Sequence, residues 1–194
     1  MPIPPGTDTA QLRSLRPDLE KKHTWLTVLL DAYQFLDASL TRELAALDKK
    51  PVCAPGCAAC CSQPVPLSLA ESMGIRLFLN EVFCPSPFLP GEEDENAFRW
   101  QCPFIRSGNC AIYAVRPFAC RRYLVFSRQC APKEDPVTAR PGDVHDASAW
   151  ALLRAQQMTL PIYRALGHAA EDSAGSDFFK KFSTFIQHIP WRRP

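Results

Sequence analysis

The chain has 194 residues, 46% of them hydrophobic, and 22 basic against 20 acidic side chains give a formal net charge of +2. That length suits one domain, 1–194, with a core of its own. Near-neutral charge argues against a large phosphate footprint, so we expect no nucleic-acid partner. The 19 prolines predict several helices joined by irregular loops.

The start of the chain, residues 1–6, is proline-rich and lacks the basic-then-apolar pattern of a secretory signal. The most apolar early stretch, residues 25–36, is too short and too polar to span a bilayer. We therefore expect a cytoplasmic protein without a membrane partner. In that compartment, clustered cysteines bind metals or take part in catalysis more often than they form disulfides.

The first third of the chain predicts a flexible tail followed by a long helix. Residues 1–15 are expected to be loose. Pro17 with the acids after it predicts the first turn of a helix. Apolar residues at three- and four-residue steps predict that this helix continues with one buried face, at Leu26, Leu29, Tyr33, Leu36, Leu40, Leu44 and Leu47.

Shorter elements are predicted after this helix. A capping box of Ser68 and Glu71 predicts a helix over 69–82 with Leu69, Met73 and Leu77 facing inward and Phe78 as a further candidate. A Ser-Gly-Asn turn predicts a short β-hairpin within 98–113. Two helices are expected in a C-terminal region, 146–190: one near 146–166, broken at a proline, and one at 176–189. The predicted fold class is mainly α: several helices around an irregular cysteine-rich metal-binding core with a short β-hairpin.

Eight of the nine cysteines form two groups in a metal-binding region that we place at 51–130. A short loop with Cys-x2-Cys spacing lets two sulfurs converge on one ion, so four cysteines within nine residues predict a metal site. The first group is Cys53, Cys57, Cys60 and Cys61, and the second is Cys102, Cys110, Cys120 and Cys130. The ninth, Cys84, is expected to be an ordinary buried cysteine.

The adjacent pair Cys60 and Cys61 indicates more than one metal position. Neighbouring side chains diverge in both helices and strands, so the two do not easily chelate one tetrahedral ion together. Eight thiolates then suggest two nearby sites or one polynuclear cluster. Sulfur-only ligation suits zinc and iron–sulfur clusters alike, and the sequence does not separate them.

Arginines surround the second group. Between Asn96 and Lys133 there are six arginines and no Asp, Glu or Lys. Because a thiolate cluster is negatively charged, guanidinium groups beside it would offset its charge and donate hydrogen bonds to sulfur. We expect this role for Arg116 and Arg121, which lie close to cysteines. For Arg99, Arg106 and Arg128 that role, an anion site and simple solvation all stay open.

The ordered motifs resemble a known family. Cys57-Ala-Ala-Cys60-Cys61 and a Leu-Ser-Leu-Ala-Glu helix start at 67–71 are followed by Cys-Pro-Phe-Ile at 102–105, Gly-Asn-Cys-Ala-Ile-Tyr at 108–113 and Arg-Pro-Phe-Ala-Cys-Arg at 116–121. Together they resemble the YkgJ-type CxxCxxCC family, described as zinc- or iron-chelating proteins with eight characteristic cysteines. The eight positions carried over are those of the two groups above, and the match is looser after Tyr123, before Cys130. The family also resembles the cysteine-rich part of flagellin lysine methylase.

These observations leave more than one function open. The first is a metal-binding protein without catalysis of its own, because thiolates are plentiful and no acid/base pair or nucleophile triad appears. The second is an iron–sulfur enzyme using S-adenosylmethionine or redox chemistry, because the spacing of Cys53, Cys57 and Cys60 also occurs in radical S-adenosylmethionine enzymes. Whether the protein is an enzyme stays open, as do a catalytic residue and a protein partner.

Overall fold

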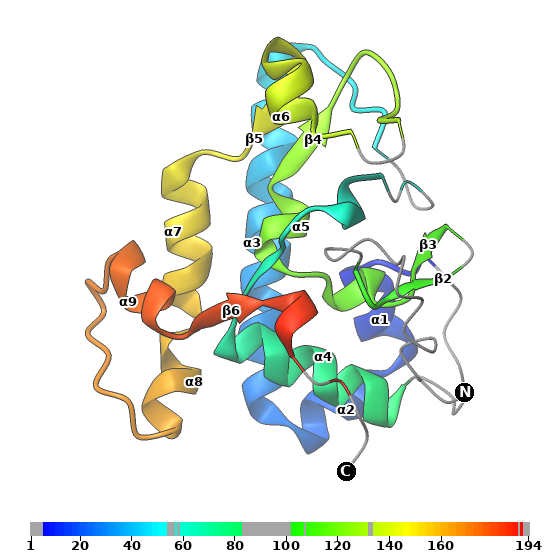
Figure 1. Cartoon of the computed structure of the whole chain (residues 1–194). Helices are drawn as coiled ribbons and strands as arrows, with labels where there is room; N and C mark the ends of the chain where they lie inside the picture. The colour runs from blue at the N-terminus through cyan, green and yellow to red at the C-terminus, as the bar shows by residue number, and fades with distance from the viewer. Residues whose placement is uncertain are drawn as a thin grey trace.

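A 24-residue helix, α3 (Thr24–Leu47), runs through the centre of the molecule, and the other elements pack around it (Figure 1). The structure, a computed structural model, describes residues 6–53, 57, 59–82, 102–106, 108–131, 134–189 and 191, with the backbone alone at 59, 60 and 106. The protein is mainly helical, as predicted. The other helices are α1 (Thr9–Leu15), α2 (Pro17–Lys22), α4 (Leu69–Glu81), α5 (Phe118–Arg121), α6 (Pro136–Ala139), α7 (Ala149–Met158), α8 (Leu160–Ala165) and α9 (Ser176–Lys181).

Short strands and 3₁₀ turns complete the fold. The strands form three two-stranded antiparallel pairs within the part of the chain that is described: β1 (Pro66–Ser68) with β6 (Ser183–Phe185), β2 (Ile105–Arg106) with β3 (Asn109–Cys110), and β4 (Tyr123–Val125) with β5 (Val144–Asp146). The 3₁₀ turns are η1 (Ala59–Ser62), η2 (Tyr113–Val115), η3 (Pro141–Asp143) and η4 (Ile186–His188). No helix in the described ranges is long and apolar enough to cross a membrane.

The predicted apolar stripe forms the centre of the core. Its members from Leu26 to Leu40 are buried, whereas Leu47 is exposed at the end of α3. The helix ends where Asp48 adopts a left-handed conformation (φ 48°). The predicted continuous helix from Pro17 is divided at His23, which separates α2 from α3.

The prediction of a flexible tail over 1–15 is wrong for Thr9–Leu15, which form α1. Asp8 and Gln11 make a capping box at its start, and Leu12, 1% exposed, is part of the core. The Thr9 hydroxyl donates a hydrogen bond to the carbonyl of Ala114 at 2.6 Å. This segment is ordered by long-range packing, which the sequence of a seven-residue helix with one buried leucine does not reveal.

The capping box of α4 is confirmed, but its buried face is turned from the predicted one. Leu69, Met73 and Leu77 are half-buried, whereas Phe78, the further candidate, is fully buried together with Ala70, Glu71, Gly74 and Ile75. Glu71 explains the rotation: besides the cap, its carboxylate accepts a hydrogen bond from the backbone N–H of Phe118 at 2.6 Å. Gly74 lets this face approach α3, since a Cβ there would lie 2.4 Å from Leu29 Cδ2.

The C-terminal region is only partly as predicted. The break near Pro161 is confirmed, because α7 ends at Met158 and α8 carries this proline in its first turn. The helix predicted over 176–189 is wrong beyond Lys181. There the chain becomes β6, which pairs with β1 in the register Leu67 to Thr184. This partner is far away in the sequence, so local periodicity does not indicate it.

Candidate metal centre

The segments that carry the cysteines lie on one side of α3, on the right in Figure 1. They are residues 52–53 in the loop that follows α3, the turn η1, the β2–β3 hairpin, and the stretch from α5 through β4 to residue 131. Two sets of backbone contacts hold them together. Backbone contacts therefore join segments that carry members of both cysteine groups.

The first contact joins the two cysteine groups directly. The backbone N–H of Cys102 donates to the carbonyl of Cys61 at 2.7 Å. Cys110 is close to the same point, because it is paired with Ile105 in the hairpin and the N–H of Ile105 bonds the carbonyl of Cys102 at 3.3 Å. Cys102 is buried, whereas Cys61 and Cys110 are half-buried. Three of the eight predicted ligands thus sit on adjoining backbone.

The second contact involves Cys53 and β4. The N–H of Val52 donates to the carbonyl of Val125 at 2.9 Å, and the N–H of Val125 donates to Cys53 Sγ at 3.3 Å. Cys120 lies in α5, which leads directly into β4, and Cys130 lies in the loop that leaves it. An N–H group donating to sulfur favours the thiolate form that metal binding requires.

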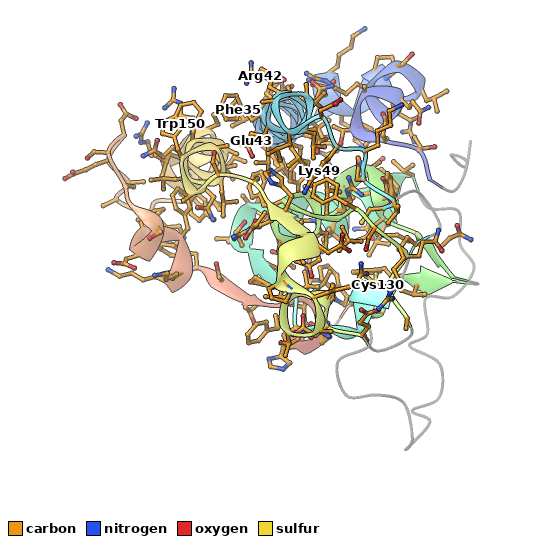
Figure 2. The ribbon with its side chains drawn as sticks, turned by 90° about the horizontal axis from the view of Figure 1, so that it is seen from above. Phe35, Arg42, Glu43, Lys49, Cys130 and Trp150 are labelled. Carbon is orange, nitrogen blue, oxygen red and sulfur yellow. The ribbon has the colours of Figure 1, made fainter. Side chains whose placement is uncertain are left out.

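Cys130 is held by an arginine that the sequence does not single out. Arg140 Nη2 lies 3.3 Å from Cys130 Sγ, and Arg140 Nε donates to Glu134 at 2.8 Å. Hydrogen bonds from Arg128 lower the pKa of Glu134 to about 2, so this carboxylate stays charged at neutral pH. Seen from above, Cys130 lies across the molecule from the ring pair of Phe35 and Trp150 (Figure 2).

Arg121, which is predicted to support the thiolates, donates its hydrogen bonds to groups of the core. Its guanidinium is 2% exposed in the core, and within the described ranges its hydrogen bonds go to oxygen atoms of other groups. The acceptors are the Asp37 carboxylate at 2.6 Å, the Thr9 hydroxyl at 2.9 Å and the carbonyls of Ala114 and Arg116. Arg121 therefore ties α1, α3 and η2 together. Burial lowers its pKa, which the Asp37 charge opposes.

Arg116 keeps a donor that lacks an acceptor. Its guanidinium carbon lies 4.1 Å from the ring centre of Tyr113. Its Nε is buried and has no hydrogen-bond partner among the described residues. Since a buried guanidinium N–H without an acceptor is costly, this donor could serve a negatively charged group of the candidate site.

The side chains form a less complete site than the backbone suggests. Among the described residues, no group of three or more Cys, His, Asp or Glu side chains is arranged to hold a metal ion. The side chain of Cys60 and all of Cys84 lie outside the described part, as do Arg99 and the side chain of Arg106. Sulfur-only donors suit zinc or an iron–sulfur cluster, so the donor chemistry fits the predicted group.

Comparison with known proteins adds no relative: no protein-family model, no curated protein and no solved structure matches this chain. The family resemblance therefore depends on the order and spacing of the cysteine motifs.

Proposed function

We propose that the protein binds zinc or iron, the latter also as an iron–sulfur cluster, through its eight grouped cysteine thiolates. The observation that carries the proposal is the hydrogen bond from Cys102 to Cys61, which joins the two groups across a long stretch of sequence. The ligands proposed are Cys53, Cys57, Cys60, Cys61, Cys102, Cys110, Cys120 and Cys130. The resemblance to the YkgJ-type family implies the same set.

The two contacts favour two neighbouring metal positions. Cys61, Cys102 and Cys110 meet at the hairpin, whereas Cys53, Cys120 and Cys130 are arranged around β4. This division supports the inference that adjacent Cys60 and Cys61 serve different positions. The Nε of Arg116 and the guanidinium of Arg140 would then balance the thiolate charge. A reducing compartment such as the cytoplasm keeps such thiolates available.

The alternative is an iron–sulfur enzyme using S-adenosylmethionine or redox chemistry. One observation favours it: a cavity of about 430 Å³ opens beside Cys120. A structural metal site has no need of such a space, whereas a reacting cluster does.

The test is purification without oxygen, followed by measurement of zinc, iron and inorganic sulfide per chain and of the visible spectrum. A colourless protein with stoichiometric zinc would support the binding protein and exclude the iron–sulfur enzyme. A brown protein with inorganic sulfide would exclude a zinc site and support cluster chemistry. A folded chain without either metal would contradict both.

Single Cys→Ser variants test the ligand set. Cys61→Ser should lose only part of the bound metal if two positions exist, while complete loss with unfolding would indicate one shared cluster. Cys84→Ser is the matched control, because this cysteine is expected to be no ligand. If it loses metal and Cys130→Ser does not, Cys84 is the eighth ligand instead.

A further inference from the structure

The cavity beside Cys120 has the size and lining of a small-molecule site. Its volume of about 430 Å³ falls within the range of such sites, roughly 300–1,000 Å³. Apolar walls are provided by Val65, Pro66 and Ala119 on one side and by Pro136 and Val137 on the other. These residues come from the start of β1 and the residue before it, from α5 and from α6, which are distant in sequence.

An ion pair lies in the wall of this cavity. Arg122 donates through Nε and Nη2 to the two oxygens of Asp146, and both side chains keep contact with solvent (35% and 44% exposed). Its Nη1 has no acceptor among the residues that the structure describes. Asp135 also lines the cavity, with its oxygens accepting from the Val137 N–H and the Thr138 hydroxyl. The wall therefore offers one guanidinium and two carboxylates.

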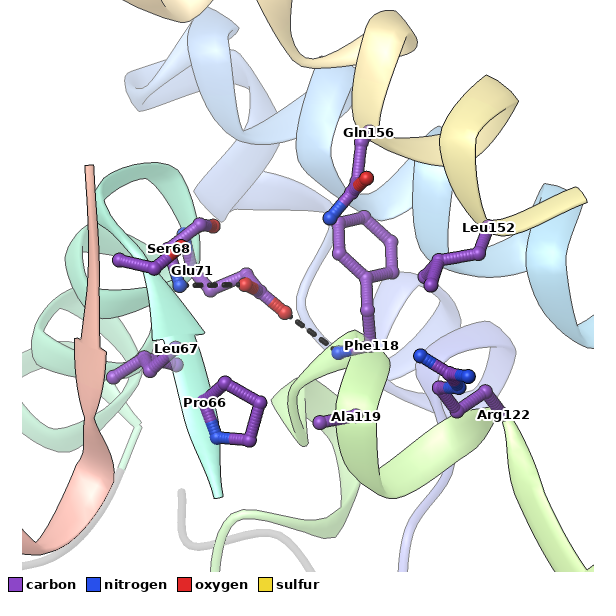
Figure 3. A pocket seen from close by; sticks show the side chains of 10 residues that line it. Pro66, Leu67, Ser68, Glu71, Phe118, Ala119, Arg122, Leu152 and Gln156 are labelled. Carbon is purple, nitrogen blue, oxygen red and sulfur yellow. Dashed lines mark hydrogen bonds between the residues drawn. The ribbon is translucent and has the colours of Figure 1, made fainter. Parts of the chain in front are cut away.

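A second, smaller cavity of about 70 Å³ lies next to the first and shares Pro66, Ala119 and Arg122 with it. Figure 3 shows Arg122 at its edge and the Glu71 carboxylate inside, bonded to the N–H of Phe118. Glu71 is 3% exposed and both its oxygens are used by backbone donors. This carboxylate is therefore occupied, and Arg122 is the charged group that faces both spaces.

We propose that the larger cavity binds a zwitterion of the α-amino acid type with an apolar side chain. Its carboxylate would bond Arg122 Nη1, its ammonium group would bond Asp146, and its side chain would pack on Pro66 and Val137. A simple anion would be repelled by Asp135 and Asp146, and a simple cation would leave Arg122 Nη1 without an acceptor. A ligand that carries both charges close together complements the ion pair, with charge-assisted hydrogen bonds at each end.

The test is titration calorimetry of the full, metal-loaded chain with L-leucine and L-phenylalanine. Their matched controls lack one charge: 4-methylpentanoate and 3-phenylpropanoate lack the ammonium group, and 3-methylbutylamine and 2-phenylethylamine lack the carboxylate. We expect at least one amino acid to bind, and its single-charge analogues to bind about ten-fold more weakly or worse. Arg122→Gln and Asp146→Asn should each weaken binding by a similar factor.

Asp172→Asn is the control variant, because it removes an exposed ion pair with Arg164 that does not line the cavity. It should bind like the unaltered chain. The proposal is overturned if neither amino acid binds at about 10 mM, if an analogue with one charge binds equally well, or if neither cavity variant weakens binding. Metal content measured on the same samples separates this result from the metal proposal, since a metal-loaded chain without amino-acid binding overturns the ligand site alone.

Discussion

Replacing Arg121 by methionine tests whether this arginine belongs to the core or to the cysteine cluster. The substitution keeps an apolar stem of similar length and removes the guanidinium. Four hydrogen bonds are lost, together with the stacking of the guanidinium carbon 4.0 Å from the ring centre of Tyr33. Breaking a buried charge pair in this way typically costs about 3–5 kcal/mol.

The surroundings place the expected loss near the lower end of that range. The Asp37 side chain is 38% exposed, so water can hydrate it once its partner is gone. The carbonyl of Ala114 keeps the Thr9 hydroxyl as a donor. The carbonyl of Arg116 loses the donor that Arg121 provided. We therefore expect Arg121→Met to lower the free energy of unfolding by about 3 kcal/mol.

Urea unfolding at neutral pH, with linear extrapolation to water, measures this change. Arg122→Met is the matched control, because its half-exposed ion pair with Asp146 should contribute at most about 1 kcal/mol. The folded fraction of Arg121→Met should still bind metal. A loss below about 1 kcal/mol, or loss of metal with normal stability, would refute the structural role and return Arg121 to the cluster.

Three other predictions follow from the structure. Burial raises the pKa of the Glu71 carboxyl above its ordinary value of 4.5. The folded state therefore holds this proton more tightly than the unfolded state, and the free energy of unfolding should fall as the pH rises from 4.5. In urea unfolding, Glu71→Gln should lack this fall. Arg140→Gln removes the donor to Cys130 Sγ and should weaken metal binding about 10- to 100-fold, measured by competition with a chromophoric chelator. Gly74→Ala should destabilise the fold by about 1–3 kcal/mol in thermal or urea unfolding, because its Cβ would clash with the buried Leu29.

Each of these three predictions has a control variant or a result that would contradict it. An unchanged stability difference between the unaltered chain and Glu71→Gln from pH 4.5 to 7 would contradict the raised pKa. Arg154→Gln, an exposed arginine that interacts with Asp172, should leave metal affinity unchanged. Gly142→Ala should be nearly neutral, since a Cβ there meets no atom within 4 Å. Equal effects of Gly74→Ala and Gly142→Ala would contradict close packing of α4 on α3.

Elements governed by local sequence were predictable, whereas those governed by distant partners were not. The stripe of α3 and the capping box of Ser68 and Glu71 depend on residues a few positions apart, and both are present. The three-residue strands β1 and β6 are stabilised by pairing with each other. Because this pairing is not visible in the local sequence, the pattern around residues 183–185 predicts a continuation of the helix α9. Likewise, the rotation of α4 depends on an N–H of Phe118, which local periodicity does not include.

The same distinction applies to the candidate site. The cysteine spacing predicts thiolate ligands, and the backbone brings the segments of both groups together through Cys61 and Cys102. The contacts of the arginines were harder to predict, because proximity in sequence to a cysteine does not determine where a long side chain points. Arg121 follows Cys120 directly yet turns into the core, while Arg140, outside the acid-free segment, reaches a sulfur atom.

X-ray absorption at the metal edge, on protein purified without oxygen, tests the central proposal most directly. It reports which elements surround the metal and at what distance. Coordination by the grouped cysteines predicts a shell of sulfur atoms at about 2.3 Å if the metal is zinc, with an added metal–metal distance if iron forms a cluster. A shell of nitrogen and oxygen atoms, or a folded protein that carries no metal, would contradict it.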